Sequence, residues 1–241
     1  MSGKLGDIWV YLSTTPLLGL TLTLVVYQAA YWVYARARFH PLANPVAISI
    51  AMIVAILTAT GTAYRTYFEG AQFVHFLLGP ATVALAVPLY AQFARVRRIW
   101  RPMVGALAVG SVTAMVSAVG VAWLLGASKV TLVSIAPKSV TAPIAMGIVE
   151  KVGGLPSLTA VLVVSTGIIG AVSATYVLDA MRIADDAVRG FAVGVAAHGI
   201  GTARAFQRSE EAGAFAGLGM ALNGLLTAVL FPLLVWFASR F

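Results

Sequence analysis

The sequence contains no cysteine and very few charges. Only 10% of its 241 residues are Asp, Glu, Lys or Arg, and three are histidine. The absence of thiols excludes disulfides, thiolate catalysis and cysteine-based metal sites. A soluble domain usually has about 25% charged residues, so this chain cannot cover its surface with charge. We therefore expect lipid to cover most of it.

Enzyme signatures are also missing from the sequence. It has no Gly-Lys-Ser/Thr phosphate loop, no HExxH and no Gly-x-Ser-x-Gly motif. No pair of carboxylates lies in an expected span, and no histidine has a partner spaced for a metal. We expect no enzyme activity, no catalytic residue, no cofactor and no metal.

Long apolar runs dominate what is present. Hydrophobic residues make up 60% of the chain, and the mean hydropathy is +0.93. Runs of about 20 apolar residues are typical of transmembrane helices. The sequence predicts an all-α, polytopic transmembrane helical bundle of about seven to nine segments, some of them broken or re-entrant. The expected spans are residues 16–35, 45–64, 73–93, 102–125, 130–149, 156–178, 188–206 and 213–237.

The net charge of +8 resides mainly in short segments between the apolar runs. That pattern indicates membrane topology rather than nucleic-acid binding, because positive loops stay in the cytoplasm. We therefore expect a multi-pass protein of the cell inner membrane with Arg95–Arg101 as a cytoplasmic loop. Residues 1–241 form one expected membrane domain. Weak internal similarity favours half-repeats at about 15–95 and 102–240, an arrangement found in transporters.

Lys138 lies between Pro137 and Pro143, near the middle of an expected span. A lysine at that depth costs about 2.5–3.5 kcal/mol on insertion scales. The two prolines break the helix and free carbonyl groups. If the helix persists locally, Lys138 shares a face with Ser134 and Thr141. A cation among hydroxyls such as Ser139 suits a small carboxylate, whereas a structural pair with Glu150 or Asp179 is the alternative.

The segment His198–Arg204 is the second candidate. His198 and Thr202 share a helical face, while Gly199 and Gly201 permit close approach of the backbone. Arg204 can donate two bonds to a carboxylate, and His198 can titrate near neutral pH and couple transport to protons. The alternative is a structural histidine with an interfacial arginine.

Weaker candidates complete the expected site. Asn223 lies inside the last span and serves either as a site contact or as a link between helices. The Gly190/Gly194 and Gly213/Gly217 spacings predict close helix packing. The residues expected at broken helices or along a pathway are Gly79, Pro80, Thr82, Pro137, Pro143, Gly199 and Gly201.

Six motifs together resemble the LrgB/CidB family of bacterial inner-membrane proteins. They span most of the chain beyond residue 40 and occur in family order. The motifs are Leu78–Tyr90, Ser134–Ile148, Gly153–Ala160, Thr166–Val172, Ala196–Phe206 and Gly217–Ala228.

This resemblance implies two functions. Family members are linked to control of murein hydrolase export and cell lysis beside a small holin-like LrgA/CidA partner. Plant relatives look like plastid glycolate/glycerate translocators, and some bacterial members are implicated in pyruvate uptake. The residue chemistry favours a carrier of small monocarboxylates, with Lys138 and Arg204 as the anion-binding cations. The lysis role follows from no particular residue. The sequence leaves the substrate, the coupling ion and homo-oligomerisation open.

Overall fold

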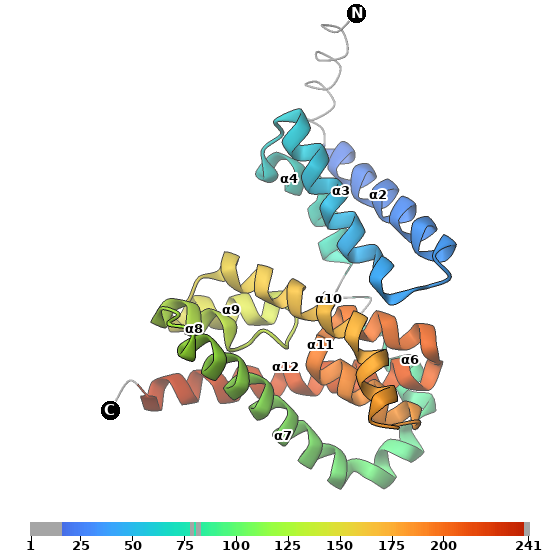
Figure 1. Cartoon of the computed structure of the whole chain (residues 1–241), viewed down its shortest axis with the longest axis vertical. Helices are drawn as coiled ribbons and strands as arrows, with labels where there is room; N and C mark the ends of the chain where they lie inside the picture. The colour runs from blue at the N-terminus through green and yellow to red at the C-terminus, as the bar shows by residue number, and fades with distance from the viewer. Residues whose placement is uncertain (1–15, 78–79, 81–82, 239–241) are drawn as a thin grey trace, which may run out of the picture. The chain divides into compact units, whose positions relative to one another are not determined.

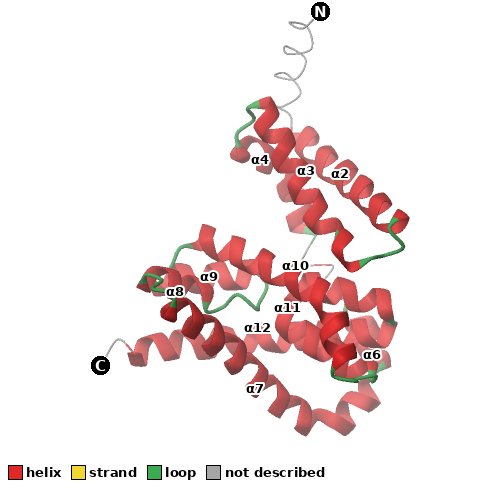
Figure 2. Cartoon of the chain, in the orientation of Figure 1, coloured by secondary structure: helices red, strands yellow, loops and turns green. Residues whose placement is uncertain are grey.

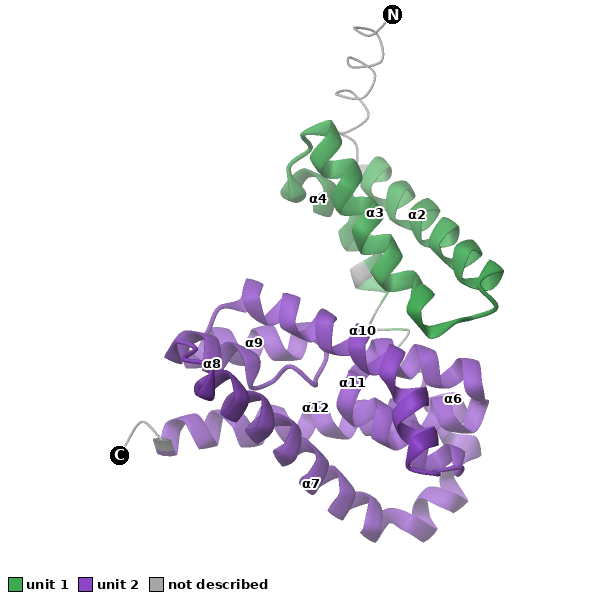
Figure 3. Ribbon diagram, viewed as in Figure 1, with its two compact units in different colours: residues 1–84 green, residues 85–241 purple. Residues whose placement is uncertain are grey.

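The computed structural model describes residues 16–77, 80 and 83–238, and within these ranges all regular structure is helical (Figure 2). The chain divides into two compact units, residues 1–84 and residues 85–241 (Figure 3). The predicted all-α architecture is thus confirmed for the described residues. The expectation of a single membrane domain built from half-repeats stays a prediction.

The first unit contains α2 (Pro16–Arg36), the short η1 (Pro41–Ala43), α3 (Pro45–Thr60) and α4 (Tyr64–Phe76). Asn44 starts α3 by accepting bonds from the backbone N–H groups of the first turn. Gly61, at φ 64°, ends α3 in the left-handed conformation that glycine adopts freely. The hydroxyls of Thr23 and Tyr67 lie 2.8 Å apart and join α2 to α4.

The second unit contains seven helices in the described part of the chain. They are α6 (Ala86–Ala91), α7 (Phe93–Leu124), α8 (Lys129–Ile135), α9 (Ala142–Val152), α10 (Pro156–Ala180), α11 (Asp186–Arg208) and α12 (Glu210–Ala238) (Figure 1). The helix α12 packs against α6, α7, α9 and α11. Its fully buried Phe215 lies in an apolar cluster with Met103 of α7 and Phe191 of α11.

Four described helices, α2, α7, α10 and α12, are long and apolar enough to cross a membrane. Many of their large apolar side chains are exposed, such as Val109 and Val116 on α7. Such exposure is expected where lipid rather than water covers the surface. These apolar helices indicate a multi-pass membrane protein.

The predicted span 73–93 covers the end of α4 at Phe76 and α6 from Ala86, and part of it lies outside the described residues, so its role as a span stays a prediction. Another expectation about the middle of the chain is wrong. Arg95–Arg101 is not a loop, because α7 begins at Phe93 and includes it. Arginine is a good helix former, so a cluster of arginines does not by itself end a helix. The helix bends instead at Ile99, three residues before Pro102.

Candidate functional site

The first broken element lies between α8 and α9. The helix α8 ends at Ile135, residues 136–141 are not α-helical, and α9 begins at Ala142. Pro143 occupies the first turn of α9, where its missing N–H costs nothing. The predicted break is confirmed. A continuous helix would place Ser134, Lys138 and Thr141 on one face. That shared face does not form, because the helix ends before Lys138.

Polar contacts hold this break in place. The Ser134 hydroxyl accepts a bond from the Leu155 backbone N–H at 2.9 Å. The Thr159 hydroxyl donates to the Ser134 carbonyl at 3.0 Å. Both Ser134 and Thr159 are fully buried. The end of α8 is therefore tied to the start of α10, and Thr141 lies at the N-cap position of α9.

The second broken element is α11, which reverses direction in its middle. The backbone leaves helical geometry at Ala197 and at His198, where φ is 41° and ψ is −135°. The Arg208 Nε donates to Asp186 Oδ1 at 2.6 Å although the residues are 22 positions apart. A straight helix would separate them by about 33 Å. The two halves of α11 therefore form a helical hairpin with its tip at His198.

Small residues let the two halves of this hairpin pack closely. A Cβ atom at Gly201 would meet the side chain of Val193 at 2.8 Å and its carbonyl at 3.0 Å. The Thr202 hydroxyl donates to the His198 carbonyl at 2.8 Å, so both lie on one face as predicted. Gly201 thus permits the close approach of the backbone that the sequence predicted. Gly199 is the residue immediately after the reversal at His198.

The two broken elements approach α12 from its opposite ends. Asp186, at the open end of the hairpin, accepts a bond of 2.6 Å from Ser209, the residue before α12. At the other end of α12, Val152 of α9 packs in the same apolar cluster as Val235. Each broken element therefore runs from one end of α12 toward its middle.

They meet near Asn223, the fourteenth of the 29 residues of α12. Gly194, on the hairpin, faces the Ala216 carbonyl. A Cβ atom at Gly194 would lie 2.0 Å from that carbonyl oxygen, so only the hydrogen of glycine fits there. Ile144, on α9, lies against Gly224, where a Cβ atom would be 2.9 Å away. Small residues on α12 and α11 allow these approaches.

Asn223 joins the two breaks directly. Its Nδ2 donates to the Ser139 carbonyl at 3.2 Å and to the Val195 carbonyl at 3.0 Å. The side chain is 1% exposed, and its Oδ1 is the one buried side-chain polar atom without a hydrogen-bond partner in the described part of the chain. A buried, unused acceptor is costly in a protein interior. Asn223 therefore links helices and also offers an acceptor at the same point.

Lys138 lies next to this junction. Its ammonium is half-buried and donates to the Ser139 hydroxyl at 3.3 Å. It lies within electrostatic range of the His198 imidazole. No ion pair joins Lys138 to a carboxylate within residues 16–77 and 83–238. Asp179, one of the partners considered from sequence, pairs instead with Arg189 at 2.6 Å.

His198 is held by a third helix. Its Nε2 lies 2.9 Å from the Val163 carbonyl on α10, and the residue is 4% exposed. The imidazole fits tightly, since a Cβ atom on Gly167 would meet it at 2.7 Å. The structure thus brings together Lys138, Ser139, His198 and Asn223, with Thr202 one turn away.

Arg204 lies elsewhere. It lines a cavity of about 220 Å³ between α10, α11 and α12 together with Arg189 and Arg208. A second, apolar cavity of about 440 Å³ lies between α7 and α11. Neither cavity is lined by Lys138 or His198. Sequence reasoning missed Arg189, because it lies among mixed charges at the start of α11 that resemble an ordinary loop.

The remaining predicted pathway residues fall in the first unit. Pro80 is exposed. Gly79 and Thr82 lie outside the described residues. The role proposed for these three residues stays a prediction.

Comparison with known proteins identifies the family. The LrgB-like family model matches residues 23–237. The chain belongs to the LrgB-like family. It is 34% identical to the YwbG protein of Bacillus subtilis over 92% of this chain and 98% of that protein.

Two further relatives have more informative names. The holin-like protein CidB of Staphylococcus epidermidis is 29% identical over 90% of this chain and 94% of its own length. The antiholin-like protein LrgB of Bacillus mycoides is 27% identical over 92% of this chain and 97% of its own length. Neither name mentions a carboxylate or transport. No solved structure matches the chain.

Proposed function

We propose that this protein acts in the membrane as a holin-like or antiholin-like protein, controlling murein hydrolase export and cell lysis. The support is that relatives named CidB and LrgB match nine-tenths or more of the chain. Its partner would be a small membrane protein of the LrgA/CidA type. These names favour lysis control over carboxylate transport.

The test is deletion of the gene in its native host, followed by measurement of murein hydrolase activity in the medium and of the autolysis rate. We expect both to change and to return when the wild-type gene is restored. The tagged protein should also co-purify with a small holin-like membrane protein from that host. Unchanged hydrolase activity and autolysis in the deletion strain would reject this function.

A second candidate function, transport of small monocarboxylates, is favoured by the junction at Asn223. Two broken helices that meet from opposite ends of a bundle are typical of secondary transporters. The Lys138 ammonium supplies a cation for the carboxylate. The unused Asn223 Oδ1 supplies an acceptor for a hydroxyl group, as in glycolate, glycerate or lactate. His198 is the candidate for proton coupling.

Uptake of labelled glycolate, glycerate, pyruvate and lactate into proteoliposomes tests the second function. Lys138→Met keeps an unbranched side chain one heavy atom shorter and removes its charge. Lys129→Met, at the exposed start of α8, is the matched control. We expect Lys138→Met to abolish uptake and Lys129→Met to retain it. If the wild type carries none of these acids, the transport function is rejected while lysis control is unaffected. If Lys138→Met transports at the wild-type rate, Lys138 does not bind the carboxylate and the proposed site is rejected.

A further inference from the structure

The 440 Å³ cavity between α7 and α11 has an apolar lining. Every residue that lines it carries an apolar side chain or is glycine. Met103, Phe191 and Phe215 are buried along it, whereas Pro102 and Val188 are exposed. The cavity is therefore an open groove, and its volume lies in the range of about 300–1,000 Å³ that ligand sites usually have.

The groove extends along one face of α7. Its lining on this helix runs from Ile99 to Ala114, about 22 Å at the usual rise of a helix. Small residues recur there at every fourth position, namely Pro102, Ala106, Gly110 and Ala114. They leave space unfilled, because a Cβ atom added at Gly110 would meet only the Val195 side chain within 4 Å, at 3.5 Å. An extended hydrocarbon chain fits this shape and would supply the contacts that the lining side chains lack.

Three arginines without acidic partners lie at one end of this groove. Arg98 and Arg101 each directly precede a lining residue of α7, and Arg97 lies in the same turn. All three residues are exposed. None of them forms an ion pair within residues 16–77 and 83–238. Arg101 lies over the ring of Trp100 at 5.6 Å, a contact that does not neutralise its charge.

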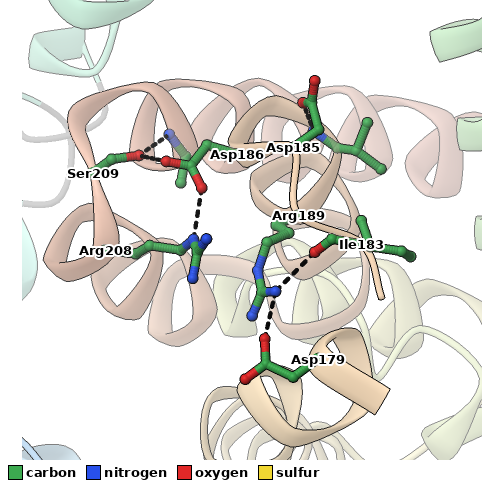
Figure 4. Close-up of polar contacts among 9 residues, drawn as sticks. Asp179, Ile183, Asp185, Asp186, Arg189, Arg208 and Ser209 are labelled. Atoms are coloured by element: carbon green, nitrogen blue, oxygen red, sulfur yellow. Dashed lines mark hydrogen bonds and ion pairs between the residues drawn. The ribbon is translucent and has the colours of Figure 1, made fainter. Parts of the chain in front are cut away.

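Three further arginines of the second unit already have carboxylate partners. The pairs are Arg95 with Asp185 and Glu211, Arg189 with Asp179, and Arg208 with Asp186. Figure 4 shows the last two pairs. The four arginines of residues 95–101 and the two carboxylates paired with Arg95 carry a formal charge of 4 − 2 = +2. The end of the groove at Ile99 is therefore positively charged even when every described ion pair is counted.

An apolar groove that ends at guanidinium groups fits an amphiphile with an acidic head. A guanidinium group presents a fork of donors that fits phosphate oxygens, and basic sites on membrane helices bind lipid phosphates. A soluble anion would leave the groove empty, and an uncharged apolar ligand would leave the arginines unused.

We propose that this groove binds an anionic phospholipid, with an acyl chain along α7 and the phosphate at Arg98. Arg97 and Arg101 add to the attraction for the acidic head. The proposal does not rest on lysis control or on carboxylate transport, because it uses none of Lys138, His198 or Asn223.

The experiment measures thermal stabilisation of the purified, full-length protein in detergent by dioleoyl phosphatidylglycerol and by dioleoyl phosphatidylcholine. We expect phosphatidylglycerol to stabilise the wild type more. Its apparent affinity should be about tenfold weaker in Arg98→Gln, the loss expected for one hydrogen bond to a charged group. Lys129→Gln is the matched control, because Lys129 is exposed and follows the opposite end of α7. It should bind phosphatidylglycerol like the wild type.

A second pair of variants tests the groove itself. Gly110→Leu places a side chain in the space assigned to the acyl chain, and it should weaken the binding of phosphatidylglycerol. Gly120→Leu, on the same helix but outside the groove lining, has no atom within 4 Å of its added Cβ and should bind normally. Equal stabilisation by the two lipids, equal affinity in Arg98→Gln and Lys129→Gln, or normal binding by Gly110→Leu overturns the proposal.

A third measurement needs no variant. Phosphatidylglycerol with a photoreactive diazirine in its acyl chain should label residues 102–114 of α7 in the wild type. Unlabelled phosphatidylglycerol should compete with this labelling better than phosphatidylcholine does. The exposed Val161 and Ile169 of α10, outside the groove lining, provide the background level. Labelling of α7 no stronger than that of α10 also overturns the proposal.

Discussion

Asp186 and Arg208 form the first and last residues of one helix and yet share a 2.6 Å ion pair. This pair closes the open end of the α11 hairpin, and the reversal at His198 forms its tip. The hairpin carries His198 toward the middle of α12.

The ion pair makes the hairpin sensitive to acid. Hydrogen bonds from Ser209 and then from Arg208 hold the pKa of Asp186 below its usual value of 3.8. The stabilisation is therefore fully present above pH 3.8 and is lost as pH falls through the lowered pKa. Between pH 7 and pH 3, the melting temperature of the wild type should fall more than that of Asp186→Asn. Parallel melting curves for the two proteins would contradict this expectation.

The strained tip gives a second prediction. His198 has φ 41°, where a side chain is strained by about 1–3 kcal/mol, and glycine is not. Both His198→Ala and His198→Gly lose the bond to the Val163 carbonyl. We expect His198→Gly to be more stable than His198→Ala, because only glycine relieves the strain. Thermal unfolding of the two variants in the same detergent measures the difference, and equal stability would exclude strain at this tip.

Close packing of the hairpin on α12 gives a third prediction. A Cβ atom at Gly194 would overlap the Ala216 backbone carbonyl. Gly194→Ala should destabilise the protein by about 1–3 kcal/mol, the usual cost of overpacking. Gly120→Ala is the matched control, because no atom lies within 4 Å of its added Cβ. It should be neutral or stabilising by up to about 1 kcal/mol. Similar unfolding temperatures for both variants would show that this contact is not tight.

Asn223 gives a fourth prediction. Removing its amide leaves the carbonyls of Ser139 and Val195 without that donor. Asn223→Ala should cost about 1–3 kcal/mol of stability, as expected for a stranded buried polar group. Ser173→Ala, whose hydroxyl bonds only within its own helix in the described contacts, should change stability by less than about 0.5 kcal/mol. If Asn223→Ala unfolds like Ser173→Ala, then Asn223 does not hold the two breaks together.

The Gly190/Gly194 prediction was accurate because it depends on local spacing. Glycines four residues apart expose backbone on one face of a helix, and both face α12 through the carbonyls of Ala212 and Ala216. The prolines around Lys138 likewise predicted a break, since proline removes a donor wherever it lies. In contrast, the Arg95–Arg101 segment was misassigned, because charge restricts depth in the membrane without restricting backbone geometry.

The sequence by itself determined a helical membrane protein with a broken segment at Lys138, because apolar length and proline act locally. The tertiary structure alone decided that α11 folds back, since the reversal depends on a positive φ at a histidine rather than at a glycine. It also decided that Asn223 bonds to both breaks and that Arg204 joins Arg189 and Arg208 at another cavity. These pairings depend on the direction of each half-helix, which residue order does not specify.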